Sequence, residues 1–257
     1  MSLAGMFLLS SALLTPPANP DYIETAWIVQ PDSAQTGERA VRDGDYVVKH
    51  RLLPPSLVEL REDAKDAKSG KVLAKAGDQL FGLLTSGAPV FCVNSVPKQN
   101  AARSLLFGSG NLQRCLIDSD KDGRLDGSFN AGNAIAGLPN FMRKRPKKPG
   151  AVSGGAYFAV DPATDRQQYF VGVRYEGRAA IIGKGSVPTF SIRYGTEDNV
   201  GSLTYDEVPK DGAFPISMTI LGARFAVLAR DAETIQVKID EAMPEQVFGV
   251  VVTTRYY

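Results

Sequence analysis

Apolar residues occur along the chain in short runs that are separated by turn-forming residues. In two of these runs, 170–175 and 235–239, apolar and polar positions alternate, which is typical of a strand with one buried face. Turns such as Asp43-Gly44-Asp45 precede several runs, because glycine takes the positive φ that tight turns need. In the first half of the chain we therefore predict strands at 23–29, 46–53, 57–60, 71–74, 79–84, 90–93 and 115–117.

The C-terminal part of the chain has a denser pattern of short apolar runs. It predicts strands at 157–160, 168–175, 179–182, 189–194, 202–205, 215–221, 224–229, 234–239 and 247–256. Closely spaced short strands with turns between them are typical of a β-sandwich. We therefore predict a mainly β protein with two β-rich modules, the C-terminal one a β-sandwich.

A break in the pattern separates the two modules. Residues 139–155 (PNFMRKRPKKPGAVSGG) combine prolines, glycines and basic residues, a composition that is typical of linkers. The sequence thus predicts an N-terminal β-rich module over 19–138, a basic linker over 139–155 and a C-terminal sandwich over 156–257. The basic run is either a solvated linker or a docking site for an anionic surface, and its residues are Arg143, Lys144, Arg145, Lys147 and Lys148.

Residues 1–18 have the character of an export signal. An apolar stretch over 3–14 ends at Thr15-Pro16-Pro17, and its length fits the hydrophobic region of a signal peptide but is too short to span a bilayer. No Lys or Arg precedes this stretch, so a buried apolar segment of a cytosolic protein is the alternative. We expect an exported protein, located in the periplasm, at the cell surface or outside the cell.

The two cysteines of the chain bear on the same question. Cys92 and Cys115 each lie in a predicted strand, and a disulfide between them needs an oxidising compartment. Two buried free thiols, which behave as small apolar groups, are the alternative. We expect the disulfide, because it agrees with export.

Composition excludes several classes of function. The 257 residues include 29 Lys and Arg and 28 Asp and Glu, and this net charge of +1 argues against a globally basic nucleic-acid-binding protein. Hydrophobic residues make up 44% of the chain, so a folded core is expected rather than disorder. The single histidine, His50, removes most metal and acid–base sites that are built on histidine.

One motif carries chemistry. Residues 118–126 read DSDKDGRLD, which places aspartates at alternate positions before a glycine that permits a sharp turn. Their carboxylates repel one another unless a cation lies among them, and calcium binds six to eight hard oxygen ligands. An ordinary Asp- and Gly-rich hairpin turn without an ion is the alternative. We expect a structural calcium ion at this loop.

The loop resembles the calcium loops of EF-hands and thrombospondin type 3 repeats, whereas the rest of the chain resembles no family. The resemblance implies that Asp118, Asp120 and Asp122 bind calcium through their carboxylates. It also implies a backbone carbonyl ligand from Arg124, and Asp126 bound directly or through water. Two departures argue against a true EF-hand: Phe129 stands where the twelfth position carries a bidentate glutamate, and the flanking segments do not read as helices.

No catalytic residue is singled out by the sequence. We therefore expect an exported, non-catalytic β protein with a structural calcium ion. A carbohydrate-binding module is the first alternative, because aromatic side chains can stack on sugars; the aromatic residues concerned are Tyr157, Phe158, Tyr169, Phe170, Tyr175, Phe190, Tyr194 and Tyr205. The second alternative is a secreted hydrolase that uses paired carboxylates. The partner stays open: a glycan or an envelope component fits these expectations, and nucleic acid does not.

Overall fold

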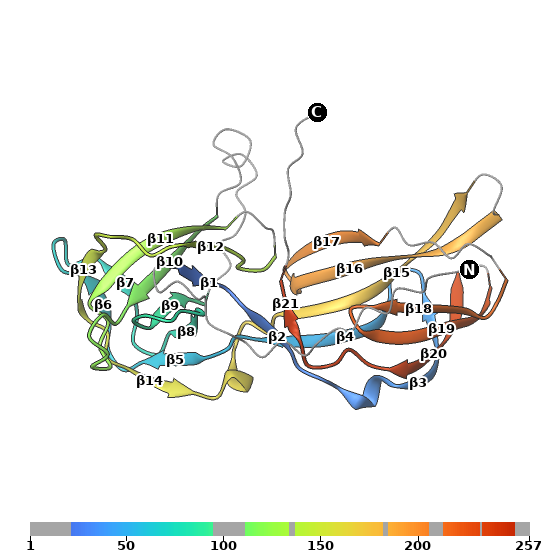
Figure 1. Ribbon diagram of the computed structural model, residues 1–257, viewed down its shortest axis with the longest axis horizontal. Helices are drawn as coiled ribbons and strands as arrows, with labels where there is room; N and C mark the ends of the chain where they lie inside the picture. Colours follow the sequence, from blue (N-terminus) through green and yellow to red (C-terminus); the bar gives the residue numbers. More distant parts are fainter. Residues whose placement is uncertain are drawn as a thin grey trace, which may run out of the picture.

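The computed structural model describes residues 22–94, 111–133, 137–181, 185–205, 213–231 and 233–249. Their regular secondary structure is almost entirely β-strand, with two short 3-10 helices at Ser33–Gln35 and Pro162–Thr164 (Figure 1). All strand pairings are antiparallel. The predicted fold class, mainly β, is confirmed.

Nine strands form a sheet that curls round on itself, on the left of Figure 1. Its strand order is β14-β5-β8-β9-β10-β11-β13-β6-β7. At one end of this order β14 pairs with β5, and near the other end β13 pairs with β6. Because β5 runs directly into β6 along the chain, and β13 runs directly into β14, these two pairs of strands are continuous and the sheet closes. The strands are β5 (Leu57–Leu60), β6 (Ala64–Asp66), β7 (Val72–Ala74), β8 (Gln79–Gly82), β9 (Val90–Val93), β10 (Asn111–Ile117), β11 (Gly127–Asn133), β13 (Gly150–Gly154) and β14 (Tyr157–Val160).

This closed sheet has a hydrophobic core of its own. The core contains Val58, Leu60, Ala64, Ala74, Leu80, Phe91, Leu116 and Leu125, all of them buried. A separate two-stranded sheet pairs β1 (Tyr22–Glu24) with β12 (Met142–Lys144). Its Ile23 is fully buried, which ties the start of the described chain to the main core.

Two further sheets pack face to face as a β-sandwich, on the right of Figure 1. The Phe190 ring of the first sheet lies 5.5 Å from the Phe225 ring of the second, edge to face. The first sheet has the order β17-β16-β15-β4-β2-β21 and contains β2 (Trp27–Val29), β4 (Tyr46–Leu53), β15 (Phe170–Ile181), β16 (Gly185–Thr196), β17 (Asn199–Tyr205) and β21 (Val247–Phe248). The second has the order β18-β19-β20-β3 and contains β3 (Gly37–Arg42), β18 (Ile216–Ile220), β19 (Ala223–Arg230) and β20 (Thr234–Glu241).

The strand pairings run across the boundaries predicted at 138 and 156. Strands β2, β3 and β4 come before the closed sheet in the chain, yet they pair with β21, β20 and β15 of the sandwich. Residues 139–155, the predicted linker, contain β12 and β13, and β13 pairs with β11 and β6. The closed sheet is thus inserted between two parts of the sandwich. Hydrophobic patterning identifies strands but not their partners, and so it does not reveal this arrangement.

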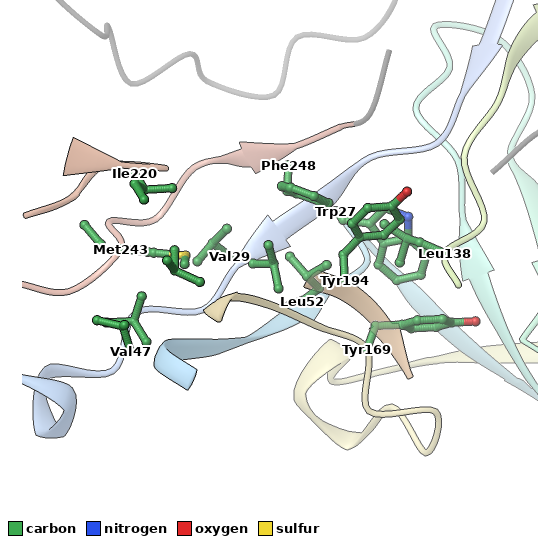
Figure 2. Close-up of a cluster of buried hydrophobic side chains, with 14 of the residues drawn as sticks. Trp27, Val29, Val47, Leu52, Leu138, Tyr169, Tyr194, Ile220, Met243 and Phe248 are labelled. Carbon is green, nitrogen blue, oxygen red and sulfur yellow. The ribbon is translucent and has the colours of Figure 1, made fainter. Parts of the chain in front are cut away.

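The main hydrophobic core runs from the sandwich into the closed sheet, and Trp27 lies where the two meet (Figure 2). The Trp27 ring is 4.5 Å from the Tyr169 ring and 5.4 Å from that of Phe81 on β8. Its Nε1 donates a 2.7 Å hydrogen bond to the Pro139 carbonyl. Trp27 therefore joins both halves of the molecule by packing and by one buried hydrogen bond.

Some predictions fall on residues outside the described ranges. These are the signal peptide at 1–18, residue 182 at the end of the strand predicted at 179–182, and residues 250–256 of the last predicted strand. Among the residues that are described, no helix has the length and apolar character required to cross a membrane.

Candidate metal centre

The aspartate-rich loop connects β10 to β11 at one end of the closed sheet. Cys115 of β10 lies directly opposite Cys92 of β9, and the two form a disulfide with an S–S distance of 2.02 Å. The predicted disulfide is confirmed. The covalent link therefore joins the strand that leads into the loop to its neighbour, three residues before Asp118.

Asp118 is held firmly at the start of the loop. Its side chain is buried, and its carboxylate accepts hydrogen bonds from the backbone N–H groups of Asp122 (3.2 Å) and Gly123 (3.1 Å). The Tyr157 hydroxyl donates a third, of 2.6 Å, to Oδ2. Gly123 has a φ of 85°, a value that favours glycine and lets the chain fold back over the carboxylate.

Three carboxylates converge in the loop. Asp118, Asp120 and Asp122 each place one carboxylate oxygen within 4.8 Å of the other two, and Asp120 and Asp122 are exposed to solvent. Like charges at this separation repel one another, and a bound cation relieves that repulsion. The group is one that could hold a metal ion. An all-oxygen set of this kind suits hard cations rather than zinc or copper.

The other two residues predicted as ligands make different contacts. Asp126 accepts hydrogen bonds from the backbone N–H (3.2 Å) and the Oγ (2.8 Å) of Ser119, across the base of the loop. The Arg124 side chain pairs with Glu62, and its backbone N–H donates to Asp122 Oδ1 at 2.8 Å. The structure thus brings three of the five predicted residues together, while Asp126 and the Arg124 side chain brace the loop.

Leu125 anchors the loop to the closed sheet. Its side chain is 1% exposed and belongs to the core of the closed sheet. Its backbone N–H donates to the Gly155 carbonyl at 3.3 Å. At Gly155, where φ is +78°, a Cβ atom would lie 3.2 Å from the Leu125 Cβ, so a glycine is required for this close approach.

The sequence did not predict that Tyr157 contacts Asp118, although Tyr157 is part of this site. It is 39 residues away in the sequence, on β14, and only the closure of the sheet brings the two together. Burial raises the pKa of Tyr157 well above its usual range, and the hydrogen bond to Asp118 and its negative charge raise it further. Tyr157 therefore stays protonated and acts as a hydrogen-bond donor that orients Asp118.

Replacing Tyr157 with phenylalanine tests this role. We expect Tyr157→Phe to lower the free energy of unfolding by about 1.5–3 kcal/mol, because it removes a hydrogen bond to a charged group. Urea unfolding at neutral pH measures the change. An unchanged unfolding midpoint would show that the hydroxyl does not hold Asp118. Phe158→Leu is the control, because Phe158 follows Tyr157 on β14 and its side chain therefore points to the opposite face of the sheet.

The predicted basic run is largely engaged with the protein itself. Arg143 Nη1 donates to the Asn130 carbonyl at 2.8 Å, and Arg145 Nη2 donates to Thr85 Oγ1 at 2.9 Å and to the Ala88 carbonyl at 2.6 Å. The Lys144 ammonium lies 5.8 Å from the centre of the Tyr22 ring. The last two residues of the run, Lys147 and Lys148, are exposed.

The aromatic residues considered for glycan binding are mostly interior. Tyr169, Phe170, Tyr175, Phe190 and Tyr194 are buried. Tyr157 and Phe158 are half-buried, and the Tyr205 side chain lies outside the described residues. This set therefore presents no exposed aromatic platform in the described part of the chain.

The described residues around the cavity beside β7 do not include a cluster of groups suited to catalysis. A cavity of about 540 Å³ lies beside β7 and the end of β9, and Asp78 is its one carboxylate among the lining residues described. His50 is buried, with Nδ1 at 3.1 Å from the Gln30 carbonyl and Nε2 accepting a hydrogen bond from the Met243 N–H at 3.4 Å. Both ring nitrogens of His50 thus serve backbone groups.

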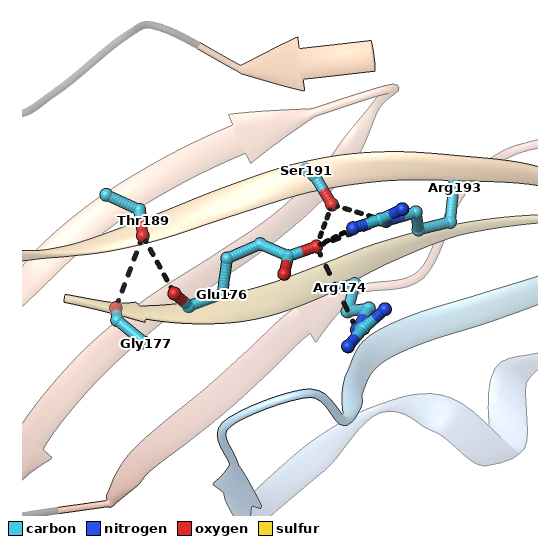
Figure 3. Close-up of polar contacts among 6 residues, drawn as sticks. All are labelled: Arg174, Glu176, Gly177, Thr189, Ser191 and Arg193. Atoms are coloured by element: carbon cyan, nitrogen blue, oxygen red, sulfur yellow. Dashed lines mark hydrogen bonds and ion pairs between the residues drawn. The ribbon is translucent and has the colours of Figure 1, made fainter. Parts of the chain in front are cut away.

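A second polar cluster lies on the outer face of the six-stranded sheet (Figure 3). Glu176 of β15 accepts hydrogen bonds from Ser191 and from Arg193 Nε (3.1 Å) and Nη2 (2.6 Å) of β16, with Arg174 Nε at 3.8 Å. Burial acts to raise the pKa of Glu176, but the hydrogen bonds from Ser191 and Arg193 outweigh it and hold the pKa below its usual value. The cluster is an ion-pair network that joins β15 to β16 through Glu176 and Arg193.

Comparison with known proteins finds no relative: no protein-family model, no curated protein sequence and no solved structure matches the chain. The function must therefore be argued from the residues of this chain alone.

Proposed function

We propose that residues 118–126 form a structural calcium site in an exported, non-catalytic β protein. The observation that carries the proposal is the convergence of Asp118, Asp120 and Asp122 within 4.8 Å on a loop whose first carboxylate is already fixed in place. Fixed carboxylates lower the entropic cost of binding, and calcium tolerates the irregular geometry that a short loop provides.

The backbone of Arg124 supports a fourth ligand. The Gly123 carbonyl accepts from the Tyr157 N–H, and the Leu125 N–H donates to the Gly155 carbonyl. The N–H of Arg124, which lies between them, instead donates to Asp122 Oδ1. In an extended residue the N–H and C=O point to the same side of the chain, so the Arg124 carbonyl faces the aspartates as well. Water and Asp126 through water would complete the coordination.

The surroundings of the loop fit export. A disulfide lies three residues before Asp118, and such bonds form and persist in oxidising compartments. Calcium is available at millimolar concentration outside the cytosol to sites with a dissociation constant on the order of 10⁻⁴–10⁻³ M. A calcium ion here would cross-link β10, β11 and, through Tyr157, β14.

Calcium-dependent thermal stability tests the proposal. With the affinity given above, about 10 mM calcium should stabilise the protein by about 1.5–3 kcal/mol and raise the midpoint of melting by roughly 3–10 °C. We expect the double variant Asp120→Asn/Asp122→Asn to lose this rise, because it removes two carboxylate ligands. Differential scanning calorimetry with calcium and with chelator measures both.

A matched control separates site binding from general charge effects. Asp240→Asn removes an exposed carboxylate that pairs with Lys238 on the sandwich, far from the loop in the fold. It should respond to calcium as the unaltered protein does. A melting midpoint that calcium leaves unchanged would refute the calcium site, and an equal rise in the double variant would place the ion elsewhere.

A further inference from the structure

The segment 161–169, which we call the joint segment, connects the closed sheet to the sandwich. Arg51 of β4 donates from Nη1 to the Ala163 carbonyl (2.7 Å) and from Nη2 to the Asp165 carbonyl (2.6 Å). On the other side, Gln79 Oε1 accepts from the Arg166 N–H at 3.0 Å. The joint segment is therefore hydrogen-bonded both to the sandwich and to the closed sheet, and Asp165 is its central residue.

Asp165 is a buried acid with one half of its carboxyl group unused. It is 2% exposed, and Oδ1 accepts hydrogen bonds from Asn94 Nδ2 and from the Gln167 N–H. Oδ2 is buried and has no hydrogen-bond partner among the described residues. Leaving a buried carboxylate oxygen unpaired is costly, so the arrangement needs an explanation.

Asn94, the partner of Asp165, also has a buried oxygen that no described residue pairs with. It is 8% exposed, its Nδ2 is committed to Asp165 Oδ1, and its Oδ1 is buried without a partner among the described residues. The bond from Nδ2 fixes which way the amide points. Two groups already joined by one hydrogen bond thus each carry one unpaired oxygen, and both oxygens are acceptors.

One proton placed between Asp165 Oδ2 and Asn94 Oδ1 would give both oxygens a hydrogen-bond partner. We infer that Asp165 is a neutral carboxylic acid in the folded protein, at pH values where exposed carboxylates are ionised, and that its Oδ2–H donates to Asn94 Oδ1. A carboxylic acid and a primary amide then form two hydrogen bonds in one ring. The proton is taken up from water on folding, and no other bond is made or broken.

The charged and titratable neighbours are consistent with this assignment. The Arg51 guanidinium is turned to backbone carbonyls rather than to the carboxylate, and that of Arg166 donates to Glu59 and to the Gly77 carbonyl. The Tyr169 hydroxyl is buried without a partner among the described residues. Asp161 accepts from the Ala163 N–H, and Lys75 and Asp78 line the adjacent cavity with Asn94. No cation is seated on the carboxylate in this part of the chain.

The electrostatics agree. Burial raises the pKa of Asp165, and this effect outweighs the hydrogen bonds from Gln167 and Asn94 and the charge of Arg51, which act to lower it. Because the pKa is higher in the folded than in the unfolded chain, the pair contributes fully below the unfolded value of about 3.8. The contribution is lost as the pH rises through the folded value. Alkalinisation therefore loosens the joint between the closed sheet and the sandwich.

The assignment is tested first in the unaltered protein. The ¹³Cγ resonance of Asp165, assigned through the backbone, reports its protonation directly. We expect it to titrate above the ordinary aspartate value of about 3.9, so that the protonated form persists at pH values where exposed aspartates are already ionised. A resonance that titrates at or below the ordinary value overturns the inference.

A variant tests the effect on stability. In Asp165→Asn the side-chain NH₂ replaces the acid O–H as donor to Asn94, so both hydrogen bonds persist without a titrating group. The folding constant of the unaltered protein relative to this variant should fall by up to about tenfold per pH unit above the unfolded value, then level off. Asp240→Asn, which removes an exposed carboxylate on the sandwich, is the control for the loss of one acidic group. A ratio that stays constant between about pH 4 and pH 8 contradicts the inference.

Discussion

Replacing Trp27 with alanine is expected to lower the free energy of unfolding by about 4–6 kcal/mol, the largest effect of any single change considered. Truncating a buried tryptophan costs about 3–5 kcal/mol through lost burial and the cavity left behind. The Pro139 carbonyl, which accepts from Trp27 Nε1 at 2.7 Å, also loses its partner. Since single domains are stable by about 5–15 kcal/mol, Trp27→Ala should be close to unfolding at room temperature.

The contributions of packing and hydrogen bonding can be separated. Trp27→Phe keeps an aromatic ring against Tyr169 and Phe81 but removes the Nε1 donor, so a loss of about 1–3 kcal/mol is expected. Urea unfolding followed by far-ultraviolet circular dichroism suits both variants, because Trp27 is the one tryptophan in the chain and fluorescence is lost with it. A loss below about 1 kcal/mol for the alanine variant would mean that Trp27 does not join the two halves.

Removal of the disulfide should have the next largest effect. The Cys92–Cys115 bond spans 23 residues, and closing a loop of that length is worth about 3 kcal/mol in the chain-entropy description. We expect Cys92→Ala/Cys115→Ala to be destabilised by that amount, with the increased entropy of the unfolded chain as the main cause. Urea unfolding of the oxidised protein and of the double variant gives the difference.

Reduction of the unaltered protein provides the control for packing. Both sulfur atoms are fully buried, so the reduced protein retains their volume while it loses the covalent link. If the cross-link dominates, the reduced protein and the alanine variant should unfold at similar urea concentrations. A reduced protein as stable as the oxidised one would assign the loss in the variant to the missing sulfur atoms instead.

Strands with strong apolar character could be predicted from the sequence almost residue by residue. The predicted strands 46–53, 57–60, 90–93 and 157–160 coincide with β4, β5, β9 and β14. Strands β3, β11 and β13 were not predicted, because sequences such as GSFNAGN and GAVSG have little intrinsic β propensity. They become strands because neighbouring strands offer them backbone hydrogen bonds, which is a property of the tertiary structure.

In the candidate site, too, local residues could be predicted from the sequence and long-range contacts could not. Aspartates at alternate positions before Gly123 signal a tight acidic turn, and the structure does bring Asp118, Asp120 and Asp122 together. The side chains of Tyr157 and Glu62, which attach the turn to other strands of the sheet, are both distant in the sequence. The buried pair of Asp165 and Asn94 is likewise separated by 71 residues. Local patterns can identify the groups that do chemistry, but not the long-range contacts that orient them.

The position of β2, β3 and β4 has a consequence for how the chain folds during synthesis. These strands leave the ribosome before the closed sheet, yet among the described residues β3 pairs with β20 alone and β4 pairs with β15, both made after the closed sheet. The inserted sheet has most of its partners within a continuous stretch and can complete its hydrogen bonds earlier. During that interval Val41, Val47 and Leu52, which end in the core, remain exposed to solvent and to other nascent chains. Residues 27–53 are therefore the part of the chain that waits longest for its strand partners, because those outside the segment itself lie beyond residue 160.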